Sequence, residues 1–364
     1  MDFGELEYKE DWPRAARRLE AFWDRQILDR AIIQVTAPRD GVTRRAIPTP
    51  PTLEERWTNV EYAVEAANER LRTTYFGGEA FPMYFPNIGP DVFAGYLGCD
   101  IVFGEDTSWS VPLIEDWDRA PRLWLDPENR WWKLTLEMTR AAVEVGAGKF
   151  IVGLTDLHGG LDAVAALRDP QNLALDLIQN PDAVKRAVDD LIPVWFEVYE
   201  AMRKVINPRI PGTTTWLTAW DAGRYYPVSC DFICMISREM FDEFVLKDIR
   251  AETDWLDRSI FHLDGPAAVR HLDTLLEMPG IHAIQWVPGE KIPPEPMTKS
   301  IPLLKRIQAA GKGLHLSVRA EEVETLLEAL QPEGLILQAS TRTEEDARRL
   351  VRRVEELTSR RKVF

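Results

Sequence analysis

Apolar and polar positions along the C-terminal half of the chain follow a pattern typical of alternating strands and helices. Short apolar or β-branched runs predict strands, and the longer amphipathic segments between them predict helices. The predicted strands cover residues 259–263, 282–286, 313–318 and 334–338. The predicted helices cover residues 267–276, 300–310, 320–330 and 344–357. Successive strand–helix units favour parallel strands. A strand–helix–strand crossover within one sheet is right-handed almost without exception, so these units should all wind in the same direction.

The first half of the chain continues this pattern with further strands and well-marked helix starts. Asp169-Pro170 and Asn180-Pro181 each place a capping residue before a proline, which predicts two successive helices. Thr52 and Glu55 have the spacing of a capping box at the start of an amphipathic segment, residues 53–72. The predicted strands here cover residues 31–36, 81–85, 100–103, 150–155 and 213–218.

About nine predicted strands approach the eight of a (βα)8 TIM-type barrel, so we expect this α/β fold. With 364 residues and 45% hydrophobic content, the chain can bury one large core, which favours a single domain over residues 1–364. Residues 1–80 are expected to form an N-terminal helical extension that packs on the barrel. A doubly wound open sheet is the alternative, although the GxGxxG fingerprint of its dinucleotide-binding members is absent from the early strands.

Charge and composition restrict the classes of function. A formal net charge of −15 argues against nucleic-acid binding, which requires a basic face. Three cysteines do not suggest a disulfide scaffold, so a reducing compartment is expected. The acidic N-terminus lacks the blocks of a signal peptide, and no apolar run is long enough to span a bilayer. We therefore expect a cytoplasmic protein that acts on a small molecule and does not bind membranes.

Two short motifs of the same form mark a candidate active site: Asp156-Leu157-His158 and His262-Leu263-Asp264, each at the end of a predicted strand. Alternate side chains of a strand point to the same side, so each motif can aim a carboxylate and an imidazole into one space. Such groups can act as general acid and base, or bind a divalent metal such as zinc, with His262 and Asp264 as ligands. Spacing alone does not choose between these roles, and strand-end Asp and His residues also cap helices. The glycines that follow, Gly159-Gly160 and Gly265, permit sharp turns and close approach of a ligand.

Asp231 is a further catalytic candidate, because an acid among apolar neighbours is costly unless it is paired or functional. It lies between Cys230 and Cys234. A zinc site at these cysteines would need two more ligands, so we interpret them as small buried apolar side chains.

Aromatic side chains near strand ends suggest a binding surface, since they can stack on a flat ring or a sugar. The proline-rich loop of residues 288–296 would lie over the mouth of a barrel, where catalytic loops are found. We interpret His271 and His282 as structural. The predicted substrate-binding residues are Asp156, His158, Trp216, Tyr225, Trp286 and His315.

Several segments together resemble the uroporphyrinogen decarboxylase superfamily of barrel enzymes, which also includes zinc-dependent methyltransferases that serve corrinoid proteins. The resemblance covers roughly the last two thirds of the chain. It is found in residues 165–191, in Ile236 to Leu246, in Phe261-His262-Leu263-Asp264-Gly265 and in residues 280–288. It implies a barrel with an active site at its mouth, and a homodimer.

The chain also departs from both enzyme types of that superfamily. The arginine-rich N-terminal motif of the decarboxylases is missing from the first 50 residues, and Leu337 to Thr341 lacks their late histidine. The methyltransferases bind zinc through a His-x-Cys pair where this chain has His262 and Asp264, and their second cysteine falls near Ser340. Only His262 matches cleanly, and aspartate in place of cysteine favours a harder ligand set.

Three functions remain open from the sequence. The first is a metal-assisted, methyltransferase-like enzyme in which His262 and Asp264, with Asp156 or His158, hold a metal that activates a small substrate, with a corrinoid protein as methyl partner. The second is a metal-independent decarboxylase or lyase in which Asp264 or Asp231 transfers a proton and His262 stabilises developing charge. The third is a barrel without catalytic activity that binds a ligand.

Overall fold

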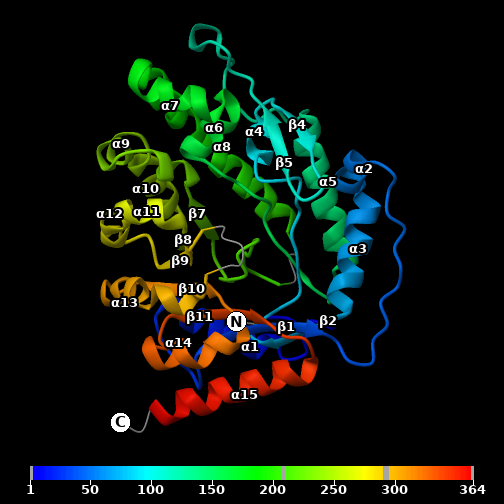
Figure 1. Ribbon diagram of the computed structural model, residues 1–364. Helices are drawn as coiled ribbons and strands as arrows, with labels where there is room; N and C mark the ends of the chain where they lie inside the picture. The colour runs from blue at the N-terminus through cyan, green and yellow to red at the C-terminus, as the bar shows by residue number, and fades with distance from the viewer. Residues whose placement is uncertain (1–2, 207–209, 290–294, 362–364) are drawn as a thin grey trace.

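A seven-stranded, largely parallel sheet organises the computed structural model, which describes residues 3–206, 210–289 and 295–361 (Figure 1). Its strand order is β2-β1-β11-β10-β9-β8-β7, and every neighbouring pair is parallel except β1 and β2. The strands are β1 (Ile32–Pro38), β2 (Thr74–Gly78), β7 (Tyr225–Ser229), β8 (Arg258–Asp264), β9 (Ala283–Val287), β10 (Gly313–Ser317) and β11 (Leu335–Ser340). The chain is therefore a mixed α/β protein, as the sequence predicts.

Two smaller sheets complete the strand content of the described residues. β3 (Met83–Tyr84) and β6 (Ile151–Val152) pair in parallel, whereas β4 (Asp100–Phe103) and β5 (Ser108–Val111) form an antiparallel pair. The strand predicted at residues 100–103 thus forms, but outside the main sheet. The closed barrel itself stays a prediction.

Helices connect the parallel strands and cover the outside of the sheet. In Figure 1, β7 to β11 follow one another down the centre of the view, with α9 to α14 beside them. The helices before β7 are α1 (Trp12–Trp23), α2 (Leu53–Thr58), α3 (Val60–Arg72), α4 (Val92–Tyr96), α5 (Arg130–Val145), α6 (Gly160–Arg168), α7 (Pro170–Gln179) and α8 (Pro181–Val205). After β7 come α9 (Arg238–Phe244), α10 (Leu246–Trp255), α11 (Gly265–Ala268), α12 (Leu272–Glu277), α13 (Ile301–Ala309), α14 (Val323–Ala329) and α15 (Glu344–Arg361). Short 3₁₀ turns are η1 (Trp117–Arg119), η2 (Asp231–Met235), η3 (Val269–His271), η4 (Met297–Ser300) and η5 (Ala320–Glu322).

Alternate residues of the central strands enter two different cores. Phe261 and Ile284 belong to the large core, while their chain neighbours Ile260 and Ala283 belong to a second cluster. That second cluster also contains Trp12, Trp23 and Trp220. Since successive side chains of a strand point to opposite faces, the two faces of the sheet are both buried in this region.

Several predicted boundaries need correction. Residues 213–218 form no strand, because Thr213 makes only an isolated bridge to Asp221. Strand β7 was not predicted, and the predicted strand at residues 150–155 shortens to Ile151–Val152. The predicted helix over residues 53–72 begins with the expected capping box but divides at Asn59, whose side chain caps α3. The predicted helix over residues 267–276 is divided among α11, η3 and α12.

The segment of residues 1–80, predicted as an extension, contributes β1 and β2 to the sheet and also contains α1 to α3. Among the described residues, no helix combines the length and the apolar character needed to cross a bilayer.

Candidate functional site

Two neighbouring parallel strands bring Asp231, His262 and Asp264 together. Ser229, the last residue of β7, pairs with His262 on β8, and Asp231 follows two residues later at the start of η2. Oδ1 of Asp231 lies 3.9 Å from Nε2 of His262. One potential ligand atom from each of the three residues lies within 4.8 Å of the others. The three predicted catalytic residues thus form one cluster at the carboxyl ends of two strands.

The imidazole of His262 is held in one orientation. Gln285 pairs with it in register on β9, and its Oε1 lies 2.5 Å from Nδ1 of His262. Because an amide oxygen only accepts hydrogen bonds, Nδ1 carries a proton, and in the neutral ring the lone pair then lies on Nε2. The Trp216 ring contacts the imidazole edge to face, with centroids 5.2 Å apart. His262 therefore presents an acceptor nitrogen toward Asp231.

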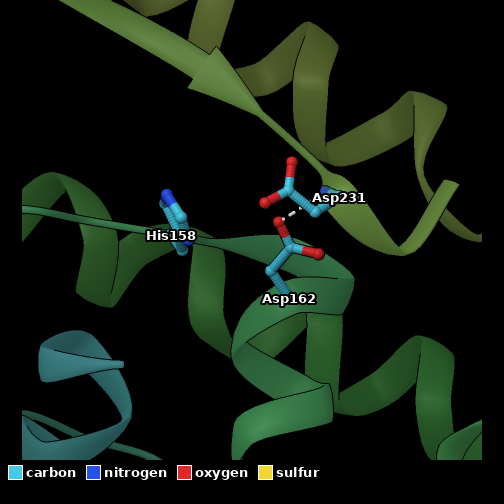
Figure 2. A group of neighbouring side chains, drawn as sticks. All are labelled: His158, Asp162 and Asp231. Atoms are coloured by element: carbon cyan, nitrogen blue, oxygen red, sulfur yellow. Dashed lines mark hydrogen bonds between the residues drawn. The ribbon is translucent and has the colours of Figure 1, made fainter. Parts of the chain in front are cut away.

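A second group of potential ligands, His158, Asp162 and Asp231, shares Asp231 with the first. Figure 2 shows the carboxylates of Asp162 and Asp231 next to one another, with the His158 ring at one side. Oδ2 of Asp162 accepts from the backbone N–H of Asp231 at 2.8 Å, and Oδ1 accepts from Phe232 at 2.9 Å. Asp162, in the first turn of α6, therefore fixes the start of η2 and with it the position of Asp231.

Asp162 was not predicted from the sequence. The available signal was an acid within the apolar run Leu161 to Val164, the same reasoning that selected Asp231. Its partners on η2 lie 69 and 70 residues away in the chain, so no local pattern indicates the contact.

Asp156 and His158 form a close pair beside these groups. Nε2 of His158 lies 3.3 Å from Oδ1 of Asp156. Burial raises the pKa of Asp156 above its ordinary value. Burial alone would lower the pKa of His158, but the surrounding carboxylates, Asp156 first and then Asp162, outweigh it and raise that pKa. The pair can therefore hold a proton near neutral pH.

Two buried carboxyl groups of α10, Asp248 and Glu252, lie behind the turn at Gly159-Gly160. A Cβ at Gly159 would come within 2.6 Å of Oε1 of Glu252, and one at Gly160 within 2.2 Å of Oδ2 of Asp248. Burial raises the pKa of Asp248 to about 7 and that of Glu252 well above its ordinary value. The two glycines thus allow the Asp248 and Glu252 side chains to lie close to the backbone, whereas the sequence suggested close approach of a ligand.

His315, Tyr225 and Trp286 are placed differently from the cluster. His315 of β10 pairs in register with Gln285 of β9 and is fully buried, and neither ring nitrogen has a hydrogen-bond partner among the described residues. Burial lowers its pKa to about 3, so the ring is neutral at physiological pH. Tyr225 begins β7, away from Asp231, and its hydroxyl donates to the Leu217 carbonyl at 3.1 Å.

Trp286 is buried in the large core, and its indole N–H donates to Oγ of Ser300 at 2.8 Å. Tyr225 and Trp286 are therefore not brought to the cluster, whereas Trp216 is in contact with it.

Two cavities lie near the carboxyl ends of β1, β9, β10 and β11. One of about 490 Å³ is lined by Val287, Ser317 and Arg319 among others. Another of about 290 Å³ is lined by Trp216 and Arg70 among others, and both have Thr36 and Gln338 in their walls. Pro288, Gly289 and Glu295 of the predicted mouth loop line the first cavity, while residues 290–294 lie outside the described part of the chain. Neither cavity is lined by Asp231, His262 or Asp264; the second is linked to the cluster through Trp216, whose ring contacts that of His262.

The cysteines and the two histidines interpreted as structural have local contacts. Cys230 is buried with Sγ 3.7 Å from Oδ1 of Asp162, and the Cys234 thiol donates to the Asp264 carbonyl at 3.2 Å. Nε2 of His271 lies 2.9 Å from the Ile233 carbonyl oxygen, and Nδ1 of His282 accepts from the Ser259 N–H at 3.2 Å. None of these four residues belongs to a potential metal group in the described structure.

Comparison with known proteins gives one kind of likeness. No family model matches the chain, and no curated protein matches its sequence. In structure it is similar to a methyltransferase from Methanosarcina mazei, with a TM-score of 0.60 at 13% sequence identity. The match covers 94% of this chain and 98% of that chain. The two proteins therefore share a fold over nearly their whole lengths.

Proposed function

We propose that this protein is a metal-assisted, methyltransferase-like enzyme in which Asp231, His262 and Asp264 bind a divalent cation. The observation that supports the proposal most directly is the convergence of these three side chains within 4.8 Å, with His262 oriented by Gln285. Imidazole held by an outer-shell hydrogen bond is the usual state of a histidine ligand. Two carboxylates and one imidazole suit zinc, manganese or iron(II), and no thiolate is required.

We also propose that the parallel strands close into a (βα)8 barrel with this cluster at its mouth. Hydrogen bonds beyond the short β3–β6 pair support closure: Gly153 donates to Tyr84 and Leu154 donates to Thr214, each at 2.8 Å. These bonds extend the strand pairing through residues 153 and 154 toward the segment before β7. A site on the carboxyl side of such strands is the usual location in barrel enzymes.

Methyl transfer is proposed because the structural neighbour is named a methyltransferase and because the cluster suits the charge change of that reaction. The bond between the methyl carbon and the donor heteroatom breaks, and its electron pair stays on the heteroatom. A nucleophilic acceptor, a corrinoid protein in this proposal, supplies the pair for the new bond to the methyl carbon. When bound, the cation would act as a Lewis acid on the donor heteroatom.

The chain's own residues have separate tasks in this scheme. Gln285 and Trp216 orient His262, while Asp162 holds Asp231 through backbone hydrogen bonds. His158, with its raised pKa, can deliver a proton to the heteroatom as negative charge develops there.

A metal-independent decarboxylase or lyase is the second candidate, and the Asp156–His158 pair favours it. Burial raises the pKa of Asp156 and the neighbouring carboxylates raise that of His158, so the pair can share one proton close to the cluster and support acid–base chemistry without a cation.

Metal analysis of untagged protein distinguishes the two candidates. We expect about one divalent ion per chain, lost in His262→Ala and Asp264→Ala but retained in the control His282→Asn, because His282 lies outside the cluster. Protein that is metal-free after incubation with zinc, manganese or iron(II) would reject the first candidate. Metal retained in both alanine variants would show that the proposed ligands are wrong.

A further inference from the structure

Arg70 is a cation at the wall of the 290 Å³ cavity. It lies in the last turn of α3, and its guanidinium makes no hydrogen bond or ion pair within the described ranges. Its neighbour Arg72 differs, since Nη2 of Arg72 lies 2.7 Å from Oε1 of Glu69. Arg45 also pairs with Glu69, at 3.0 Å. Glu69, the acid near the end of α3, thus pairs with Arg45 and Arg72, and no ion pair between Glu69 and Arg70 is found within the described residues.

The surroundings of Arg70 are not acidic. The pKa of Arg70 is lowered from its ordinary value, first by burial in the surrounding protein and second by the positive charge of Arg44. Its side chain nevertheless remains exposed, because it borders the open cavity. In a chain with a net charge of −15, a guanidinium without an acid partner at a cavity wall is a site where a negative ligand gains energy.

Trp216 contributes part of its ring to the wall of the same cavity. Its Nε1 is buried and has no hydrogen-bond acceptor in the part of the chain that the structure describes. Because that nitrogen is not accessible, Arg70 alone supplies the donor groups of positive charge at this wall.

The rest of the wall limits the size and charge of the ligand. Gln34, Thr218 and Gln338 bond mainly to one another: Oγ1 of Thr218 donates to Oε1 of Gln34 at 3.0 Å, and Nε2 of Gln338 donates to Oγ1 of Thr218 at 3.2 Å. The remaining lining is mostly apolar, including Phe81 and Phe85. One guanidinium matches a single carboxylate through two parallel hydrogen bonds, and the apolar wall suits a short hydrocarbon body.

The cavity also adjoins the candidate metal centre. Trp216 lines the cavity and at the same time contacts the His262 ring, with centroids 5.2 Å apart. A small molecule anchored at Arg70 can therefore extend past Trp216 toward His262.

We infer that Arg70 forms an anion subsite in this cavity, and that the substrate of this enzyme is a small molecule with a carboxylate group and a short apolar body. The identification as substrate rests on the proposed function, whereas the anion subsite itself does not. Arg70 is the binding residue, and Trp216 forms the wall between the subsite and His262.

Ligand binding to the full-length, metal-free protein tests the subsite independently of the metal. The protein is first dialysed against a chelator. Binding of butyrate and of its neutral counterpart butyramide is then measured by ligand-observed saturation-transfer NMR. We expect butyrate to bind with at least tenfold higher affinity than butyramide, because the guanidinium pairs only with the charged group. Arg70→Met should lower butyrate affinity at least tenfold, and Arg70→Lys should lower it less.

The control is Arg17→Met, since Arg17 is exposed on α1, lies outside the cavity lining and carries the same charge. Butyrate affinity should be unchanged in Arg17→Met. Equal affinity for butyrate in Arg70→Met and the unmodified protein, equal binding of the two probes, or no butyrate binding would each overturn the subsite. If the protein binds no metal but binds butyrate in a way that depends on Arg70, the proposed function is rejected and the anion subsite stands.

Discussion

Replacement of Gln285 by leucine tests whether the hydrogen bond to His262 prepares a metal ligand. The bond joins Oε1 of Gln285 to Nδ1 of His262 at 2.5 Å, and the Gln285 side chain is 7% exposed. Leucine removes the acceptor while keeping a similar side-chain volume. The imidazole then loses the partner that fixes its tautomer and ring orientation.

The expected effect is a loss of metal affinity of about 10- to 100-fold, the usual range for an outer-shell partner, or about 1.4–2.7 kcal/mol. Gln285→Glu should bind zinc at least as tightly as the unmodified protein, because a carboxylate accepts the same hydrogen bond more strongly. Zinc dissociation constants from competition with a chromophoric chelator provide the measurement.

Gln308→Leu is the matched control. Gln308 is 4% exposed, and its amide donates to and accepts from the backbone of Gln331 at 2.7 and 2.9 Å. Its loss should reduce stability without changing zinc affinity, since Gln308 belongs to α13 and not to the cluster. Zinc affinity that is unchanged in Gln285→Leu, or reduced equally in both variants, would refute the role assigned to Gln285.

Three further predictions concern stability. His315 has a folded pKa of about 3, below its ordinary value, so the unfolded chain binds the extra proton as pH falls. Its contribution is therefore complete above about pH 6.5 and decreases below it, by up to about 1.4 kcal/mol per pH unit; His315→Leu should flatten this dependence in urea unfolding at pH 4–7. Glu79→Gln should cost about 3–5 kcal/mol, because the fully buried Glu79 carboxylate binds Arg18 at 3.0 Å and Arg30 at 2.6 Å. A loss under 1 kcal/mol on thermal unfolding would contradict that estimate. Gly160→Ala should lower the free energy of unfolding by more than the roughly 1–2 kcal/mol expected for an alanine in a left-handed conformation, because its Cβ would clash with the Asp248 carboxylate. Gly148→Ala should lower it by only that roughly 1–2 kcal/mol, because no atom lies within 4 Å of the added Cβ. Equal losses of unfolding free energy in the two variants would show that the Asp248 side chain moves away from the added Cβ without loss of stability.

Local pattern determined the regular part of this protein. The four C-terminal strands were predicted to within two residues at each end, because alternation and flanking helices are properties of short segments. The capping box at Thr52 formed as predicted for the same reason. The placement of His262 and Asp264 on one face of a strand end also follows from alternation alone.

Tertiary structure decided which side chains meet. β7 was missed because Tyr225 to Ser229 has no alternating pattern and contains Pro227, a residue that is unfavourable inside a sheet. Without β7, the sequence could not place Asp231 beside His262. The sequence likewise did not predict the contacts of Asp162, Gln285 and Arg70, because these depend on the register of parallel strands and on cavities between distant segments. Those contacts form when buried faces pack together across tens to hundreds of residues of sequence separation. The free energy of this packing cannot be predicted from the pattern of a short segment.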